Sequence, residues 1–359
     1  MNTLVLKRTP WERFKKGLFK YWEYYLMLIP GLALLIIFSY VPMYGITLAF
    51  KNFKMRKGIL GSPWIDPWYA NFKTFFDSPY AYRLLRNTLI ISITKVVLAK
   101  LAAVLLALLL NECRTSWYRR LVQTVSYMPH FLSWVVIYGI TYLLCSESSG
   151  YINRVLRYFD MPTVSILTSN TAFRPMLYIT HIWKGTGFSS IIYLATMTSI
   201  DPTLYEAAQV DGAGRLQRIW HITLPGIRST FVMLCIISAG SIMNAGFDQI
   251  YVFYNELVYE TGDIIDTYVY RVGLEDMRFG LSTAVGLFKN AIGFILVFGT
   301  NKIAQHWGRE FGNEQKAQAA LRHSRREGVR RICVRDSCPV LPSVVLPADL
   351  RAVRVLHAL

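Results

Sequence analysis

Four lysines interrupt otherwise apolar stretches of the chain: Lys95, Lys100, Lys184 and Lys289. An ammonium group in such a stretch is costly, so it either pairs with a neighbouring group or serves a solute pathway. Lys95 and Lys100 lie about 140° apart around a helix, since they are five residues apart. They do not share a face, and at least one should pair with a neighbouring helix. All four are candidates for contact with an anionic or hydroxyl-rich cargo.

A second polar set comprises Asn244, Asp248, Gln249 and Asn290. Asn244 and Asp248 are four residues apart, so they share one face of a helix. Sugar recognition needs planar hydrogen-bonding groups beside aromatic rings, and Trp183 is an aromatic candidate. Hydrogen bonding between membrane helices is the alternative explanation for these polar side chains.

No pattern for catalysis, metal binding or nucleotide binding is found in the sequence. The carboxylates are not paired with a histidine or a nucleophile in a recognisable hydrolase arrangement. Cys333 and Cys338 are five residues apart, which matches no zinc spacing. A phosphate-binding Gly-x-x-x-x-Gly-Lys-[Ser/Thr] motif is absent, so this chain cannot itself hold ATP. We expect no catalytic, cofactor-binding or metal-ligating residues.

The composition indicates that these residues are positioned by membrane helices. The 359 residues are 53% hydrophobic and only 17% charged, against about 25% charged residues in a typical soluble domain. The mean hydropathy is +0.31, and the apolar residues are clumped. The net charge is +17, which in this context indicates anionic lipid and cytoplasmic loops rather than nucleic acid. We therefore expect an all-α, polytopic membrane protein.

Six apolar segments have about the length that spans a bilayer. They lie at roughly 26–49, 88–110, 122–145, 176–199, 229–252 and 282–303. The first is too long for the apolar core of a signal peptide and lacks a small-x-small cleavage site, so it reads as an uncleaved signal-anchor. Pro129 is expected to disturb the third span, and Gly185 and Gly187 to interrupt the fourth.

The distribution of positive charge predicts the orientation. Six spans place both termini on one side, and Lys and Arg number 23 in the predicted inner segments against 12 in the outer ones. This bias predicts cytoplasmic N- and C-termini. The first outer loop, 51–87, contradicts the trend with seven basic residues, and the tail 316–359 inflates the inner count with nine.

A charged connector at 201–226 separates the fourth and fifth spans. Asp201 is suited to cap a helix whose first residue is Pro202, and Gly212 is suited to end it in a left-handed conformation. A second short helix is expected from 215 to 222, stopped by Pro225 and Gly226. The connector is too polar to insert, so a helix–turn–helix on the cytoplasmic surface is predicted.

The connector resembles the EAA loop of permease subunits in binding-protein-dependent ABC importers. It reads Glu-Ala-Ala at 206–208, Asp-Gly-Ala at 211–213 and Ile-x-x-Ile-x-Leu-Pro at 219–225. The resemblance covers roughly residues 20–305 and implies a type I ABC importer permease with six transmembrane helices. The segments 127–134, 246–255 and 261–270 are similar to those of carbohydrate permeases for acidic oligosaccharides of the alginate and pectin type.

The resemblance implies a role for each position of the loop. Glu206, Ala207 and Ala208 would form a coupling helix that docks in a cleft of a separate ATPase chain. Gly212 would make the turn. The remaining implied coupling residues are Asp211, Arg215, Arg218 and Pro225.

The resemblance also implies the partners and the location. They are a second homologous permease, two ATPase subunits that bind ATP and Mg²⁺, a solute-binding protein, an oligosaccharide cargo and membrane lipid, without nucleic acid. The acidic segment 253–281 suits docking to the solute-binding protein. The protein would lie in the bacterial inner membrane as a transport subunit rather than an enzyme. A neutral-sugar importer and an ion-driven secondary carrier remain the alternatives.

Three regions are therefore expected. Residues 1–25 form a basic, interfacial N-terminal segment, and residues 26–304 form the permease domain. The basic tail, 305–359, departs from the family pattern and is expected to be disordered.

Overall fold

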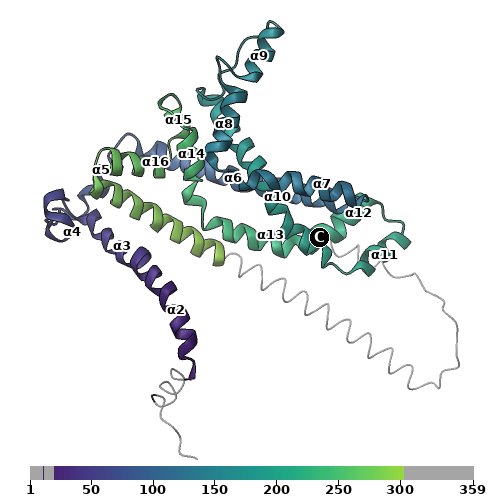
Figure 1. The fold of residues 1–359 in the computed structure, drawn as a ribbon, viewed down its shortest axis with the longest axis horizontal. Helices are drawn as coiled ribbons and strands as arrows, with labels where there is room; N and C mark the ends of the chain where they lie inside the picture. The colour runs from purple at the N-terminus through teal and green to yellow at the C-terminus, as the bar shows by residue number, and fades with distance from the viewer. Residues whose placement is uncertain (1–10, 12–19, 303–359) are drawn as a thin grey trace, which may run out of the picture. The chain divides into compact units, whose positions relative to one another are not determined.

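The computed structural model describes Trp11 and residues 20–302, and these are helical over most of their length (Figure 1). This part of the chain contains no β-strand beyond one isolated bridge between Lys51 and Trp64. The all-α prediction is therefore confirmed for the described residues. The predicted tail, 305–359, and most of the segment 1–25 lie outside them.

Four helices are long and apolar enough to cross a membrane: Trp22–Phe50, Ala81–Asn111 (α6), Arg215–Ala239 and Phe279–Lys302. A fifth span results if the bent pair Ser116–Phe131 and Trp134–Cys145 is taken as one. The predicted fourth span corresponds to α10 (Asn170–Thr198), which has the length but is not among the helices apolar enough. The described residues thus support four or five of six spans.

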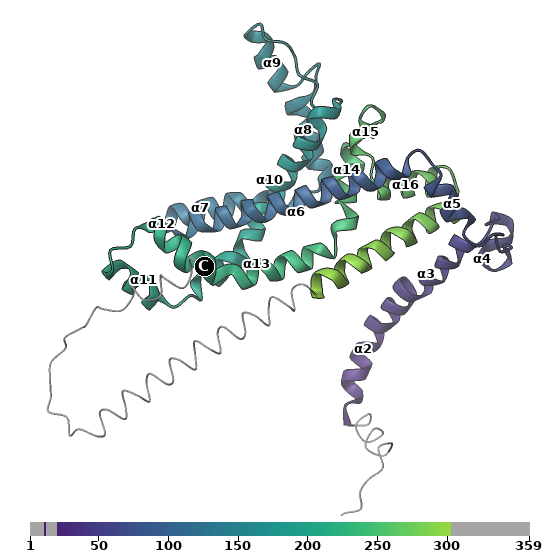
Figure 2. The same ribbon diagram turned by 180° about the vertical axis from the view of Figure 1, so that it is seen from behind.

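Short elements connect and interrupt the long helices (Figures 1 and 2). The first span contains α2 and α3, and α12 runs through a π-helical turn, Ile219–Thr223, into α13. The bounds are α2 Trp22–Leu35, α3 Val41–Met43, α4 Gly58–Gly61, α5 Ala70–Phe76, α7 Ser116–Tyr127, α8 Trp134–Cys145, α9 Tyr151–Tyr158, α11 Pro202–Val210, α12 Arg215–Arg218, α13 Leu224–Ala239, α14 Phe247–Phe253, α15 Tyr259–Gly262 and α16 Ile265–Tyr270.

The helix α6 lies at the centre of the packing and follows α10 along its length (Figure 2). Leu84, Ile91 and Ala103 of α6 are fully buried and belong to three successive hydrophobic clusters. The first two clusters join α6 to the segment that follows α13, and the third joins it to α10 and α13. A single long helix therefore aligns the elements that carry the polar candidates.

The third span breaks near the predicted position, whereas the fourth does not break. The two halves of the third span meet at 105°, on either side of the turn Met128–Phe131 that contains Pro129. In contrast, α10 continues without interruption through Gly185 and Gly187. The predicted interruption was wrong because Gly187 serves packing: a Cβ atom there would lie 2.0 Å from the Ser126 carbonyl oxygen of α7.

The boundaries of the fifth span also differ from the prediction. The prediction of one span over 229–252 was wrong. The chain is helical from Arg215 to Ala239, and the helix ends before α14 begins at Phe247. Pro225 does not stop the helix either. It occupies the first turn of α13, directly after the π-helical turn, where a missing N–H is tolerated. Ala245 and Gly246 adopt positive φ angles of 45° and 74° at the break.

Candidate functional site

The predicted cytoplasmic connector folds as a short helix followed by a tight turn. The Asp201 carboxylate accepts a hydrogen bond from the Thr203 N–H at 3.0 Å, and Pro202 is the first residue of α11. Gly212 has a φ of +79°, a backbone conformation that residues other than glycine rarely adopt. The Ala213 N–H then donates to the Ala208 carbonyl at 2.8 Å and closes the turn.

One side-chain hydrogen bond holds α11 against the start of the next span, and a second bond closes the start of α12 locally. The Tyr205 hydroxyl lies 2.9 Å from the hydroxyl of buried Thr223 in the π-helical turn. The Gln217 side chain accepts from the Gly214 N–H at 2.8 Å. The Tyr205–Thr223 bond therefore ties α11 to the turn that directly precedes α13.

Most of the predicted coupling residues are accessible. Glu206, Ala207, Asp211, Gly212, Arg215 and Pro225 are exposed, and Ala208 and Arg218 are half-buried. Apolar side chains that sequence reasoning missed accompany them: Val210 is 89% exposed, and Leu216 and Trp220 are also exposed. Exposed apolar side chains on a polar connector are typical of a surface that a partner covers.

Lys95 and Lys184 are bound to main-chain carbonyl groups where helices break. The Lys95 ammonium, in a residue only 3% exposed, donates to the Ala245 carbonyl at 3.0 Å. Lys184 donates to the carbonyls of His130, at 2.9 Å, and of Leu132. Both lysines thus satisfy carbonyl groups that a broken helix leaves without an intrahelical partner.

Lys289 is bound to side chains instead. Its ammonium donates to Asp266 at 2.6 Å and to Asn244 at 3.0 Å. Burial raises the pKa of the Asp266 carboxyl above its ordinary value, while the bond from Lys289 acts in the opposite direction. The ammonium of Lys289 is therefore held by one polar side chain from the break before α14 and by one from α16.

Asn244 and Asp266 line a cavity of about 610 Å³. Asp248 joins them, and Phe247 and Tyr270 supply aromatic rings whose centroids are 6.0 Å apart. Such a volume and such a mixture of apolar and polar lining are typical of small-molecule sites. The cavity offers carboxylate, amide and aromatic groups, with the Lys289 ammonium directly behind two of them.

Lys289 contacts two residues that line this cavity but is not itself part of the lining, and the remaining predicted pathway residues also lie outside it. Gln249 is fully buried and donates to the Leu177 carbonyl and the Thr180 hydroxyl at 2.8 and 2.9 Å, as interhelical hydrogen bonding requires. Trp183 and Asn290 are exposed, and Lys100 is half-buried. The structure therefore brings together Lys289, Asn244 and Asp248, and leaves the other candidates apart.

Sequence reasoning did not predict Asp266 and Tyr270 as pathway residues, because it assigned both to the acidic outer segment 253–281. Their four-residue spacing on α16 would have indicated a shared face. The acidic segment 253–281 is correspondingly less accessible than predicted. Asp263 and Asp266 are enclosed in ion pairs with Arg271 and Lys289, whereas Glu256, Glu260, Glu275 and Asp276 remain exposed.

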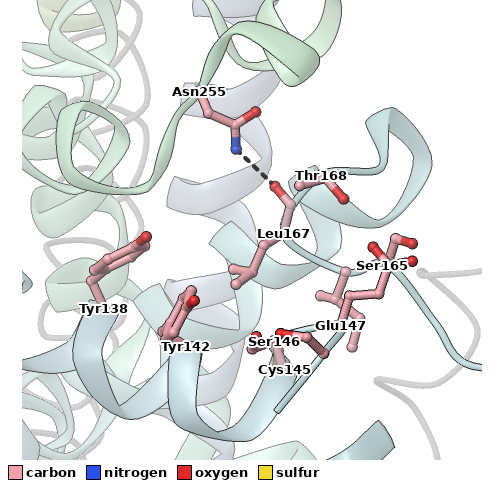
Figure 3. A pocket seen from close by; sticks show the side chains of 11 residues that line it. Tyr138, Tyr142, Cys145, Ser146, Glu147, Ser165, Leu167, Thr168 and Asn255 are labelled. Carbon is pink, nitrogen blue, oxygen red and sulfur yellow. Dashed lines mark hydrogen bonds between the residues drawn. The ribbon is translucent and has the colours of Figure 1, made fainter. Parts of the chain in front are cut away.

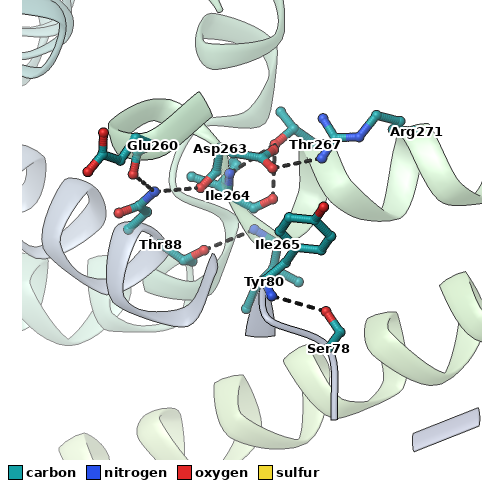
Figure 4. A network of polar contacts seen from close by, with 10 residues as sticks. Ser78, Tyr80, Thr88, Glu260, Asp263, Ile264, Ile265, Thr267 and Arg271 are labelled. Carbon is teal, nitrogen blue, oxygen red and sulfur yellow. Dashed lines mark hydrogen bonds and ion pairs between the residues drawn. The ribbon is translucent and has the colours of Figure 1, made fainter. Parts of the chain in front are cut away.

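A polar network fixes this segment to the long helices (Figure 4). Asp263, fully buried, accepts hydrogen bonds from Thr267 and Arg271, each at 2.7 Å, and its own carbonyl accepts from Asn87 of α6 at 3.0 Å. Arg174 of α10 donates to the Asn87 side chain at 2.7 Å. The wall of the 610 Å³ cavity formed by α16 is therefore anchored next to both α6 and α10.

A second cavity of about 440 Å³ lies between the end of α8 and the segment before α10 (Figure 3). Tyr138 and Tyr142 line it from successive turns of α8, and Asn255 donates to the Leu167 carbonyl at 3.2 Å beside it. Glu147 is the charged residue of its described lining, so this cavity suits a hydroxyl-rich group better than an anion.

Residues 99–307 match the model of a family described as binding-protein-dependent transport system inner membrane component. Two relatives from Bacillus subtilis (strain 168) are similar over most of the chain. Protein LplB is 45% identical, covering 80% of this chain and 89% of the relative. The polygalacturonan/rhamnogalacturonan transport system permease protein YteP is 40% identical, covering 86% and 96% respectively.

A solved structure agrees with the fold over the same region. A chain of a bacterial ABC transporter involved in the import of the acidic polysaccharide alginate superposes with a TM-score of 0.76 at 39% identity. The superposition covers 82% of this chain and 99% of that one. A chain of a bacterial alginate ABC transporter in complex with an alginate pentasaccharide-bound periplasmic protein gives a TM-score of 0.75 at 38% identity.

Proposed function

The chain belongs to the family of binding-protein-dependent transport system inner membrane components, and from this premise we propose that its cargo is an acidic oligosaccharide. The protein is the permease subunit of a carbohydrate ABC importer, a transport component rather than an enzyme. Membership of this family excludes the ion-driven secondary carrier. The alternative cargo is a neutral sugar.

The placement of the Lys289 ammonium beside an aromatic cavity is the observation that carries the proposal. The cavity offers Phe247 and Tyr270 as surfaces for sugar rings, and Asn244 as a planar hydrogen-bonding group. Two similar proteins have acidic polysaccharides in their names, alginate for one and polygalacturonan for the other. A uronate carboxylate is the group that an ammonium recognises and a neutral hexose lacks.

The ion pair between Asp266 and Lys289 allows a cargo carboxylate to take the place of Asp266. In the resting cavity its carboxylate holds the ammonium at 2.6 Å, which prevents an unpaired charge. Burial favours the neutral form of Asp266, as the raised pKa indicates. The cargo carboxylate would replace Asp266 as the partner of Lys289, and the Asn244 amide would remain bonded to the same ammonium.

We place the energy input at the connector 201–226. The exposed face of α11 around Glu206, Ala207 and Val210 would dock into the ATPase subunit, and Arg215 and Arg218 would flank it. Closure of the ATPase dimer would move α11, and the Tyr205–Thr223 bond would pass this displacement to α13. The pathway would then change between two global states, as rigid-body transport transitions do.

In the proposed transporter, this chain would form half of the translocation pathway. A second homologous permease would supply the other half, with two ATPase subunits inside and a solute-binding protein outside. The membrane would be the bacterial inner membrane with both termini cytoplasmic, and α10 would act as the fourth of six spans. Lys100, Trp183 and Asn290 remain candidates for the substrate pathway. For Lys95, Lys184 and Gln249, whose side chains bind groups of neighbouring segments, we propose structural roles instead.

Co-purification tests the assembly. Affinity-purified wild-type permease should retain ATPase chains, and exchanging Val210 for Asp should release them, because the exposed apolar contact would be replaced by a charge. Gly214→Ala is a suitable control, since only the Gln217 side chain, at 3.8 Å, lies within 4 Å of the added methyl group. A permease that transports alone in liposomes would contradict the assembly.

A further inference from the structure

The loop 51–69 follows the first membrane span directly and carries an unexplained surplus of positive charge. Phe50 is the last residue of the span Trp22–Phe50, and Lys51, Lys54, Arg56 and Lys57 come immediately after it. By the orientation we propose this loop is external, where basic residues are usually depleted. Neither the coupling of ATP hydrolysis nor the cargo cavity uses these side chains.

Lys51 holds the loop together from within. The residue is 5% exposed, and its ammonium donates to the carbonyls of Ile59 at 2.8 Å and Leu60 at 3.4 Å. It also lies 5.0 Å from the centroid of the Trp64 ring. The Ile65 N–H donates to the Phe50 carbonyl at 3.0 Å, which returns the loop to the end of the span.

Ser62 makes the second internal connection. Its hydroxyl donates to the Gly58 carbonyl at 2.6 Å and accepts from the Lys54 N–H at 3.0 Å. Gly58 has a φ of +63°, as the turn requires. In addition, Asn71 donates to the Ala49 carbonyl of the span at 2.8 Å. Loop 51–69 is therefore an ordered hairpin that internal hydrogen bonds hold against the end of the first span.

The outer surface of the hairpin combines large apolar side chains with cations. Leu60 is 80% exposed, Trp64 68% and Trp68 65%. The cations are Lys54, Arg56 and Lys57, all exposed. None of their side chains takes part in the hydrogen bonds that build the loop, where Lys54 and Lys57 contribute main-chain atoms.

The sequence position of the hairpin fixes its depth. This chain buries none of the hydrophobic window of the first span, so the side chains of that window can contact lipid. A loop that starts one residue after this span and returns to Phe50 must lie at the boundary between hydrocarbon and headgroups. Tryptophan rings and basic side chains are enriched at that depth, the rings in the interface and the cations at the phosphates.

We propose that loop 51–69 is a docking surface for the headgroups of anionic phospholipids. Leu60, Trp64 and Trp68 insert among the acyl chains near the interface, and Lys54, Arg56 and Lys57 bind phosphate groups. Lipid is favoured over a protein partner because the loop lies at the end of a span whose apolar window this chain leaves uncovered. The loop thereby holds the end of the first span at a fixed depth.

Hydrogen–deuterium exchange of the permease complex in lipid nanodiscs tests this. The complex is compared in pure phosphatidylcholine and in an equal mixture of phosphatidylcholine and phosphatidylglycerol. Peptides covering 54–68 should exchange about tenfold more slowly in the anionic mixture, because three cations each add to the attraction by a charged surface. The triple variant Lys54→Gln, Arg56→Gln, Lys57→Gln should lose this difference while the peptides of α6 keep their protection.

The control variant removes three cations elsewhere, Arg114→Gln, Arg119→Gln and Arg120→Gln, and should retain the lipid-dependent protection of 54–68. Equal exchange of 54–68 in both lipid compositions would overturn the proposal. So would protection that appears in pure phosphatidylcholine on addition of the solute-binding protein, since the surface would then dock a protein. The readout is local to the loop and does not depend on transport of any cargo.

Discussion

Three of the four lysines in the apolar segments bind one of two kinds of partner, and the partner decides what each lysine can do. Lys95 and Lys184 bind carbonyl oxygens at helix breaks, while Lys289 binds Asp266 and Asn244. A carbonyl oxygen at a break cannot be satisfied if its lysine turns to a cargo. Asp266 differs because it can be neutralised by a proton when Lys289 leaves it.

We predict that exchanging Lys184 for Met destabilises the protein by about 1–3 kcal/mol, because the His130 and Leu132 carbonyls lose their donor. Thermal unfolding of the purified permease in detergent measures this. Lys100→Met is the matched control, since the Lys100 ammonium donates no hydrogen bond to another described residue. Equal melting temperatures for the two variants would contradict the assigned role of Lys184.

At the cargo cavity, Lys289→Gln should weaken the response to polyuronate fragments by at least about tenfold, because a hydrogen bond to a charged group contributes about 1.5–3 kcal/mol. Asp266→Asn should have the opposite effect and raise the apparent affinity, since the competing carboxylate is removed. The concentration of oligouronate that gives half-maximal ATPase stimulation in proteoliposomes is the measured quantity. A lowered affinity in both variants would exclude competition between Asp266 and the cargo.

Helices and their breaks were predicted unequally from the sequence. Apolar segment length located the first, second and sixth spans, because a bilayer requires continuous apolar surface. Break positions depend on tertiary partners instead. Gly187 maintains close packing on Ser126 without any break, and Pro225 is accommodated beside a π-helical turn. Ala245, in contrast, lies at a break that no proline marks.

The contact between α10 and α7 provides a matched test at this scale. Gly187→Ala should destabilise the permease by about 1–3 kcal/mol, because the added methyl group overlaps the Ser126 carbonyl. Gly185→Ala adds the same group where no atom lies within 4 Å. The first variant should melt at a lower temperature than wild type and the second should not. Equal loss in both would show that helix flexibility, rather than close packing, requires these glycines.

The coupling helix supports a further prediction. Glu206→Lys should abolish transport while the complex remains inserted in the membrane, because a reversed charge opposes docking of the exposed face of α11. Uptake into proteoliposomes and the ATPase rate are measured together. Glu23→Lys makes the same charge change at an exposed position of α2 and should transport normally. Normal uptake by the Glu206 variant would contradict the docking role.

For the whole molecule, the sequence was sufficient for class and family because the connector motif is local and has fixed spacing. The cargo cavity was only half predictable. Lys289, Asn244 and Asp248 were found as polar residues in apolar stretches, but Asp266 and Tyr270 lie on α16, outside every predicted span. Asn87 and Arg174 anchor that segment and are hydrogen-bonded to each other. They are 87 residues apart in the sequence, and a local sequence pattern cannot predict a contact over such a separation.

The account as a whole rests on the import of an acidic oligosaccharide by this permease and its partners. Proteoliposomes containing the assembled complex, with the solute-binding protein outside and ATP inside, should accumulate a labelled oligouronate. They should not accumulate a maltodextrin of equal length, and Lys289→Gln should prevent uptake of the oligouronate. Equal uptake of both sugars, or uptake of the maltodextrin alone, would contradict the account.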